Sequence, residues 1–210
     1  MRIENEDRPE RGRLSPQEDV AAWLPDAAQA RKAPHTMPDK IIIEPIGVIE
    51  TPFRDPSGTP IQPSRAKGAR GRVRIDPRFR EGLKDLDGFE RIWLVYWLHG
   101  APGVSLTVTP FLDTGTRGIF GTRWPARPSP VGISVVRLLS VGEEFLEVAD
   151  VDIIDGTPLL DVKPYVPEFD CYPESRAGWL DQSNSRRRVA DERFESKPGG
   201  RDPEPPQRDP

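Results

Sequence analysis

Residues 131–154 read VGISVVRLLSVGEEFLEVADVDII, and this stretch decides the fold class. β-Branched and aromatic residues dominate Val131–Ser140 and Phe145–Ile154, and short runs of this composition are typical of strands. The four residues Val141-Gly142-Glu143-Glu144 between the two runs are suited to a hairpin loop. The sequence therefore predicts two neighbouring antiparallel strands.

Six further segments outside this hairpin have the same character. Each is rich in β-branched or aromatic residues and is bounded by Gly, Pro or Asp: Ile41–Ile49, Gly71–Ile75, Ile92–Leu98, Ser105–Leu112, Arg117–Gly121 and Leu159–Tyr165. Eight short strands leave many unpaired edges, which a closed or strongly curled sheet hides. We therefore expect a mainly β domain built on a closed or strongly curled sheet.

One short helix is expected between the second and third strands. Asp76 can cap it and Gly88 can end it, while Phe79, Leu83 and Leu86 share one face. With 25 prolines among 210 residues, long helices are excluded, and with them helical bundles and coiled coils.

The two ends of the chain differ from the middle in composition. Residues 1–40 and 171–210 are charged and proline-rich, and they contain too few large apolar groups to offset the entropy of ordering. We expect two disordered tails around a domain at residues 41–170. Within the first tail, residues 15–24 carry a capping box and could form a short helix.

Composition also limits the function. The longest apolar run, Ile92–Leu98, is too short to span a membrane, and no signal segment opens the chain. A single cysteine, Cys171, and two histidines offer no cluster for zinc or iron. The net charge of −4 gives the molecule no overall positive field for nucleic acid. We expect a cytoplasmic protein with no metal, no membrane contact and at most a local nucleic-acid site.

One local site of this kind stands out. Within residues 65–80, seven basic residues accompany a single acid, Asp76: Arg65, Lys67, Arg70, Arg72, Arg74, Arg78 and Arg80. Such a cluster can bind phosphates by ion pairing and counterion release. The alternative interpretation is an ordinary solvated face.

Four other motifs carry polar groups at the ends of expected strands. His99 follows an apolar strand, and the loop 121–132, which three prolines stiffen, carries Arg123 and Arg127. Residues 155–158 form a tight Asp-Gly-Thr-Pro turn, which either binds a polar ligand or only links two strands. The Asp-Thr-Gly at 113–115 matches the aspartic-protease loop, but it has no second copy and is a weak signal.

Taken in order, these segments resemble the TsaA-like family, also called the TrmO family. The residues that carry the resemblance are Ile46–Ile49 with Thr51–Phe53, Gly88–Trp93, Arg117–Arg123 with Arg127–Gly132, and Asp155–Pro158 followed by Asp161–Tyr165. The resemblance covers about residues 43–170. It implies a single-sheet β-barrel, a homodimer, and S-adenosylmethionine-dependent methylation of N6 of threonylcarbamoyladenosine beside the anticodon of tRNA.

The resemblance also implies roles for particular residues. Cofactor-binding positions would be Gln62, Pro63, Ser64, His99, Gly100, Arg123, Leu146, Asp155, Gly156, Thr157 and Pro158. Substrate or RNA phosphates would contact Arg65, Lys67, Arg70, Arg72, Arg74 and Arg127. The methylated nitrogen must lose a proton, and no residue is identified as its acceptor.

Several positions depart from the family pattern. Ser129 stands where the family has asparagine, Arg91 where it has histidine, and Trp124–Ala126 replace Ser-Pro-His. No stretch matches the C-terminal extension of longer members. These departures favour a second hypothesis, a barrel that binds S-adenosylmethionine or a related small molecule without methylating tRNA.

Overall fold

The computed structural model describes residues 41–183, 189 and 190. The expected tail at 1–40, its short helix and residues 191–210 lie outside the described part. In the described part, no helix is both long and apolar enough to cross a membrane, and no group of three or more His, Cys, Asp or Glu is placed to hold a metal.

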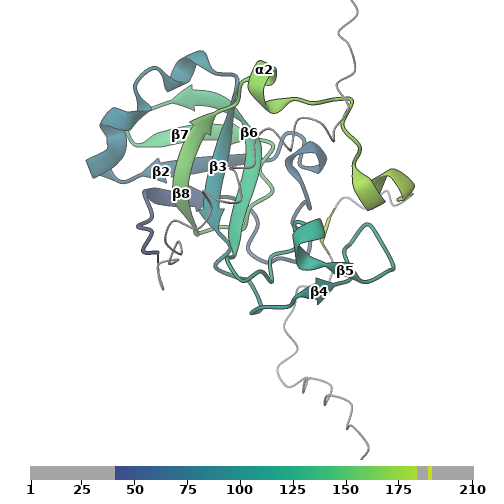
Figure 1. Cartoon of the computed structure of the whole chain (residues 1–210). Coiled ribbons are helices and arrows are strands. Elements are labelled where there is room, and N and C mark those ends of the chain that lie inside the picture. The colour runs from purple at the N-terminus through teal and green to yellow at the C-terminus, as the bar shows by residue number, and fades with distance from the viewer. Residues whose placement is uncertain (1–40, 184–188, 191–210) are drawn as a thin grey trace, which may run out of the picture. The chain divides into compact units, whose positions relative to one another are not determined.

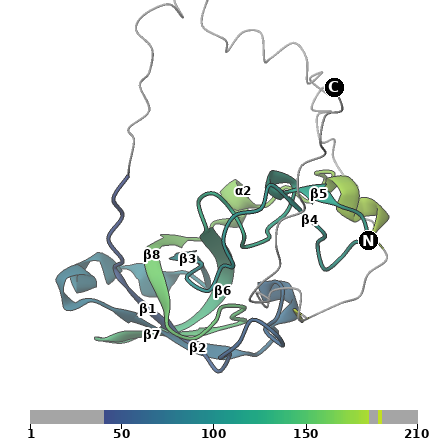
Figure 2. The ribbon, with the colours of Figure 1, turned by 90° about the horizontal axis from the view of Figure 1, so that it is seen from below.

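Six antiparallel strands close into one barrel, as Figures 1 and 2 show. Their order around the barrel is β1 (Gly47–Glu50), β2 (Arg70–Ile75), β7 (Phe145–Ala149), β6 (Val131–Val141), β3 (Arg91–Trp97) and β8 (Thr157–Pro164), which pairs again with β1. The single-sheet barrel is thus confirmed. So is the β6–β7 hairpin, in which the Gly142 amide donates to the Phe145 carbonyl at 2.8 Å.

Alternate side chains of these strands fill the barrel. Successive residues of a strand point to opposite faces, so each strand contributes every second residue to the interior. In β3 these are Ile92, Leu94 and Tyr96, and in β7 they are Leu146 and Val148, all of them buried. The outer face of β2 instead carries Arg70, Arg72 and Arg74, as the alternating sequence requires.

Two of the eight expected strands do not join the barrel. The segments expected at Ser105–Leu112 and Arg117–Gly121 contribute only β4 (Thr107–Val108) and β5 (Arg117–Gly118), which pair with each other in a separate ribbon, visible in Figure 1. Residues Ile119–Gly121 form the 3₁₀ turn η4. Runs of only two paired residues are too short to extend the main sheet.

The Asp113 turn closes this ribbon. Its carboxylate accepts hydrogen bonds from the amides of Thr114 and Gly115 at 2.7 and 3.3 Å, and it pairs with the Arg117 Nη2 at 2.7 Å. Bonding to Arg117 is the main cause of the lowered pKa of Asp113. These contacts assign the Asp-Thr-Gly tripeptide a structural role.

The expected helix after Asp76 is present, but as two short 3₁₀ helices rather than one continuous helix. Asp76 does cap it, by accepting from the Arg78 amide at 2.9 Å, but the segment forms two 3₁₀ helices, η2 (Pro77–Leu83) and η3 (Leu86–Gly88). Between them Asp85 adopts a left-handed φ of 64°, which interrupts any continuous helix. The other short helical elements are η1 (Pro63–Arg65), α2 (Pro167–Asp170) and η5 (Gly178–Gln182).

The expectation of a disordered tail from residue 171 is wrong for the residues described there. The Trp179 indole donates to the Gly121 carbonyl at 2.7 Å, and the Ser183 hydroxyl donates to the Leu112 carbonyl at 2.5 Å. Further on, the Ala190 amide donates to the Thr59 carbonyl at 2.8 Å. These are isolated long-range contacts without apolar periodicity, so the sequence pattern gave no sign of them.

Candidate functional site

Three polar side chains form a hydrogen-bonded chain at the end of the barrel where β3 ends and β6 begins. The Ser134 hydroxyl donates to the Asp152 carboxylate at 2.6 Å and lies 3.0 Å from the Tyr96 hydroxyl. Because a serine has one proton to donate, the Tyr96 hydroxyl must donate to Ser134. Tyr96 and Ser134 are only 6% and 2% exposed, so this chain leads from the barrel interior to Asp152.

Burial dominates the electrostatics of this chain. It raises the pKa of Asp152 to about 6, against the opposing effects of the Ser134 hydrogen bond and the nearby positive charge of Arg123. Burial also raises the pKa of Tyr96, and the Asp152 charge adds to that effect. A carboxylate with a pKa near neutrality both accepts and releases a proton readily, which suits a general base. Asp152 was not predicted, because the residues around it resemble the end of an ordinary strand.

Arg123 lies near this chain and reaches a predicted cofactor residue. Its Nη1 donates to the Gln62 side-chain carbonyl at 2.7 Å, so the structure brings together two predicted positions that are 61 residues apart. Gln62 precedes η1, which contains the predicted Pro63 and Ser64. Arg123 is exposed, and in the described part of the chain no other hydrogen bond occupies its guanidinium. The remaining N–H groups can bind a carboxylate.

The turn at 155–158 is pinned by its own hydrogen bonds. The Asp155 carboxylate accepts from the Thr51 amide at 2.9 Å and pairs with Arg54 at 2.5 Å. The amides of Asp155 and Gly156 donate to the carbonyls of Phe53 and Ile49. Gly156 has a φ of 76°, a conformation that glycine adopts without strain. The amides of Asp155 and Gly156 are therefore not free to bind a ligand, so they do not support the interpretation of this turn as a polar-ligand site.

The other predicted cofactor residues divide into two groups. His99 is exposed and directs its Nδ1 to the Thr157 hydroxyl at 3.3 Å, and Gly100 and Pro158 lie beside these two in the chain. Leu146 is different, because its side chain is fully buried in the core of the barrel. A direct side-chain contact of Leu146 with a cofactor is not compatible with this position.

Arg127 has a structural role in the loop. Its Nη1 faces three backbone carbonyls, those of Thr122, Ile119 and Trp124, at 2.8, 3.3 and 3.4 Å. The guanidinium also lies over the Phe120 ring, 5.9 Å from its centroid. Arg127 therefore holds loop 119–127 in shape through Nη1, and its contact with substrate stays a prediction.

Several arginines of the basic cluster at residues 65–80 form ion pairs. Arg72 pairs with Glu147 at 2.7 Å, Arg74 pairs with Glu50, and further along Arg80 pairs with Glu144 at 3.3 Å. These carboxylates come from neighbouring strands and the hairpin loop, far away in the sequence. Arg72 and Arg74, which were predicted to contact RNA phosphates, are therefore members of surface ion pairs.

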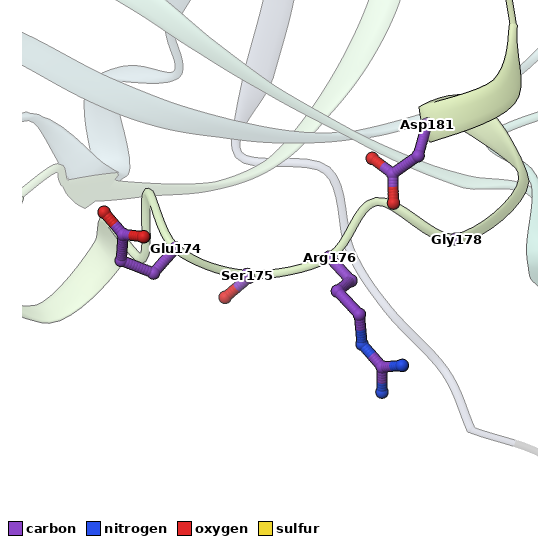
Figure 3. A pocket seen from close by; sticks show the side chains of 5 residues that line it. All are labelled: Glu174, Ser175, Arg176, Gly178 and Asp181. Carbon is purple, nitrogen blue, oxygen red and sulfur yellow. The ribbon is translucent and has the colours of Figure 1, made fainter. Parts of the chain in front are cut away.

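A surface pocket elsewhere is lined by residues that the predictions do not include: Glu174, Ser175, Arg176, Gly178 and Asp181. Figure 3 shows Arg176 turned away from both carboxylates. The Asp181 carboxylate accepts from the Ala177 amide at 3.1 and 3.2 Å, which is a local turn contact. The lining groups do not converge on one point, so this pocket is not assigned a function.

The fold and the polar groups define a closed antiparallel β-barrel whose candidate site lies at one end of the barrel, around Arg123 and Asp152. The profile of the tRNA-methyltransferase O N-terminal domain matches residues 48–171. The chain belongs to this family, as its sequence motifs predicted.

Three relatives illustrate the similarity. A probable S-adenosyl-L-methionine-binding protein of Pyrococcus abyssi is 50% identical over 147 residues, which cover 70% of this chain and 80% of the relative. The tRNA (adenine(37)-N6)-methyltransferase of Escherichia coli is 32% identical, over 65% of this chain and 62% of the enzyme. The human enzyme of the same name is 33% identical, over 62% of this chain and 31% of the enzyme.

A solved structure has the same fold. The crystal structure of TrmO from Pseudomonas aeruginosa matches with a TM-score of 0.57 and 35% identity, and the match covers 66% of this chain and 62% of that chain. This chain therefore spans less than two thirds of the solved TrmO chain and of the two tRNA methyltransferases.

Proposed function

We propose that this protein is an S-adenosylmethionine-dependent methyltransferase that acts on N6 of an adenosine in tRNA, specifically the threonylcarbamoylated adenosine beside the anticodon. Family membership and the names of the two tRNA (adenine(37)-N6)-methyltransferase relatives support the reaction. The single observation that carries the proposal to this chain is the placement of Asp152 beside Arg123, with Ser134 and Tyr96 behind it.

The residues present fit the cofactor. Arg123 offers an exposed guanidinium for its carboxylate, and Gln62 fixes one edge of that guanidinium. His99 is exposed beside Thr157 at the same end of the barrel. When bound, S-adenosylmethionine supplies a methyl group on a positively charged sulfur. A substitution of this kind needs alignment and exclusion of water rather than a covalent nucleophile.

Asp152 completes the proposed reaction. When N6 is methylated it must lose a proton, and the Asp152 carboxylate would accept that proton. Ser134 holds that carboxylate in position through its 2.6 Å hydrogen bond. The deeper Tyr96 keeps Ser134 oriented toward Asp152. The expected homodimer stays a prediction.

The direct test is transfer of tritiated methyl from S-adenosylmethionine to purified tRNA, with and without the threonylcarbamoyl group. We expect label only in tRNA and a marked preference for the threonylcarbamoylated form. Cofactor binding without any transfer to either tRNA would contradict the proposal. It would leave the binding barrel as the better account, a function that the name of the Pyrococcus abyssi relative favours.

Replacing Arg123 with alanine should weaken cofactor binding. Loss of a charge-assisted contact costs about 1.5–3 kcal/mol, so calorimetry should show a dissociation constant raised by roughly 10-fold to 100-fold. Arg72→Ala is the matched control, because it removes an exposed arginine whose partner is Glu147 on the barrel wall. Equal affinity in the Arg123 variant and the control would assign Arg123 to loop structure alone.

A further inference from the structure

The predicted basic run contains two kinds of arginine, and only the structure separates them. The outward-facing Arg72 and Arg74 of β2, and Arg78 and Arg80 after it, all pair with carboxylates: Glu147, Glu50, Glu44 with Asp76, and Glu144. In the part of the chain that the structure describes, Arg65, Lys67 and Arg70 have no ion pair. Thus the start of the run keeps its charge, while its later part is neutralised.

Two arginines that are far away in the sequence, Arg91 and Arg137, lie in one row with Arg70 on the barrel. The strand register sets Arg70 opposite Ala149, Ala149 opposite Arg137, and Arg137 opposite Arg91, across the neighbouring strands β2, β7, β6 and β3. The inward-facing neighbours Gly71, Val148, Leu138 and Ile92 are buried, so the three arginines share the outer face of the barrel. Arg91 and Arg137 are respectively 21 and 67 residues beyond Arg70 in the sequence.

One carboxylate, Asp150, organises this surface. It accepts from the Gly68 amide at 2.9 Å, and its other oxygen lies 3.4 Å from Arg91 and 3.8 Å from Arg137. The Nε of Arg137 is buried and makes no hydrogen bond. Asp150 therefore neutralises one charge among Lys67, Arg70, Arg91 and Arg137, which we call the Asp150 surface. The net charge of this surface is +3.

The Asp150 surface adjoins the candidate site. Asp150 and Asp152 are two residues apart, so their Cα atoms are separated by at most about 7 Å. On the other side, residues 62–68 connect Gln62, which contacts Arg123, with Gly68, which contacts Asp150. A nucleotide whose base lies at Asp152 would therefore bring the phosphates beside it within reach of these cations.

We propose that the Asp150 surface binds phosphates of the RNA strand next to the methylated adenosine. This proposal rests on the proposed function, because it takes its ligand from that reaction. Arginine and lysine contacts to phosphate fix the position of a nucleic acid without reading its sequence. Arg91 departs from the family pattern, which by itself weakens the tRNA assignment. The position of Arg91 in this row of cations supports contact with RNA instead.

The test compares two double variants of the full chain that remove the same charge. Lys67→Gln with Arg70→Gln removes two cations that lack ion pairs, whereas Arg72→Gln with Arg74→Gln removes two paired cations from the same barrel wall. Neither pair touches Arg123 or Asp152. Binding of purified tRNA is measured between 50 and 200 mM salt, conditions under which phosphate contacts respond strongly.

We expect the Lys67/Arg70 variant to bind tRNA at least roughly 10-fold more weakly and to have a smaller salt slope. Each lost phosphate contact should lower that slope by about 0.7–0.9. The Arg72/Arg74 variant should change affinity by less than about threefold, and both should bind S-adenosylmethionine like the unaltered protein. Arg91→Gln with Arg137→Gln should reproduce the loss, with folding checked by thermal unfolding because Asp150 loses its partners.

Each result separates the surface from the reaction. Unaltered protein that methylates tRNA, together with equal affinities in the Lys67/Arg70 and Arg72/Arg74 variants, would overturn the Asp150 surface and leave the methyltransferase intact. Unaltered protein that neither binds nor methylates tRNA at low salt would overturn both. A larger loss in the Arg72/Arg74 variant would place the RNA on the paired part of β2.

Discussion

Replacing Asp152 with asparagine should slow methyl transfer by about 10²–10⁴-fold, the range expected when a general base is removed. The amide keeps the oxygen that accepts the Ser134 hydrogen bond, but it cannot take up the N6 proton. Single-turnover transfer of tritiated methyl to tRNA measures the effect. The matched control is Asp87→Asn, which changes an exposed aspartate of η3.

The pH dependence supplies a second measure of the same group. Because the pKa of Asp152 is about 6, the unaltered protein should lose activity as pH falls through 6, where the carboxylate becomes protonated. The asparagine variant should lack this step. A variant that retains full rate, or that loses activity through loss of cofactor binding, would exclude Asp152 as the proton acceptor.

The Asp152→Asn variant should be at least as stable as the unaltered protein near neutral pH, although it transfers methyl more slowly. The pKa of Asp152 in the folded protein is above the ordinary aspartate value of 3.8, so between about pH 4 and 6 the unfolded chain releases this proton first and stability falls as pH rises. Asp152→Asn removes that penalty. Thermal unfolding should show a variant at least as stable as the unaltered protein at pH 7.5, with the gain absent at pH 3.5, so a lost rate would not reflect misfolding.

Gly132→Ala should destabilise the barrel by about 3 kcal/mol, near the upper part of the usual range for overpacking. A Cβ at this position would lie 2.2, 2.5 and 2.8 Å from three atoms of the Tyr96 ring. That ring is buried and held by the hydrogen bond between its hydroxyl and Ser134, so it cannot move away at low cost. Activity should fall as well, because displacing Tyr96 disturbs the chain to Asp152.

Chemical denaturation and methyl transfer together check this expectation. Gly118→Ala is the control, because its added Cβ meets nothing within 4 Å and its φ of −62° suits alanine. Combining Gly132→Ala with Tyr96→Leu should cost less than the sum of the two single changes, since the clash is relieved. Strict additivity would mean that the Gly132 effect does not pass through the Tyr96 ring.

The site was partly predictable from the sequence. Arg123, Gln62 and His99 are predicted cofactor positions from the family motifs, and the structure places Arg123 against Gln62. Asp152 was missed, because its distinguishing property is the burial that raises its pKa and the contact with Ser134, 18 residues away. The loop contacts of Arg127 could not be predicted either, because a sequence does not show that three loop carbonyls face its guanidinium.

The sequence by itself determined the local properties of the fold: strands with a period of two, the β6–β7 hairpin, the Asp76 cap and the Asp-Gly turn at 155 and 156. These depend on a few neighbouring residues, whose steric and hydrogen-bonding preferences act over one turn or one strand. The tertiary structure alone decided which arginines lack a carboxylate of their own and which carboxylate has a raised pKa. Charge pairing and desolvation depend on distances in space, and the closed barrel brings Arg70, Arg137 and Arg91 into one row although they are far apart in the chain.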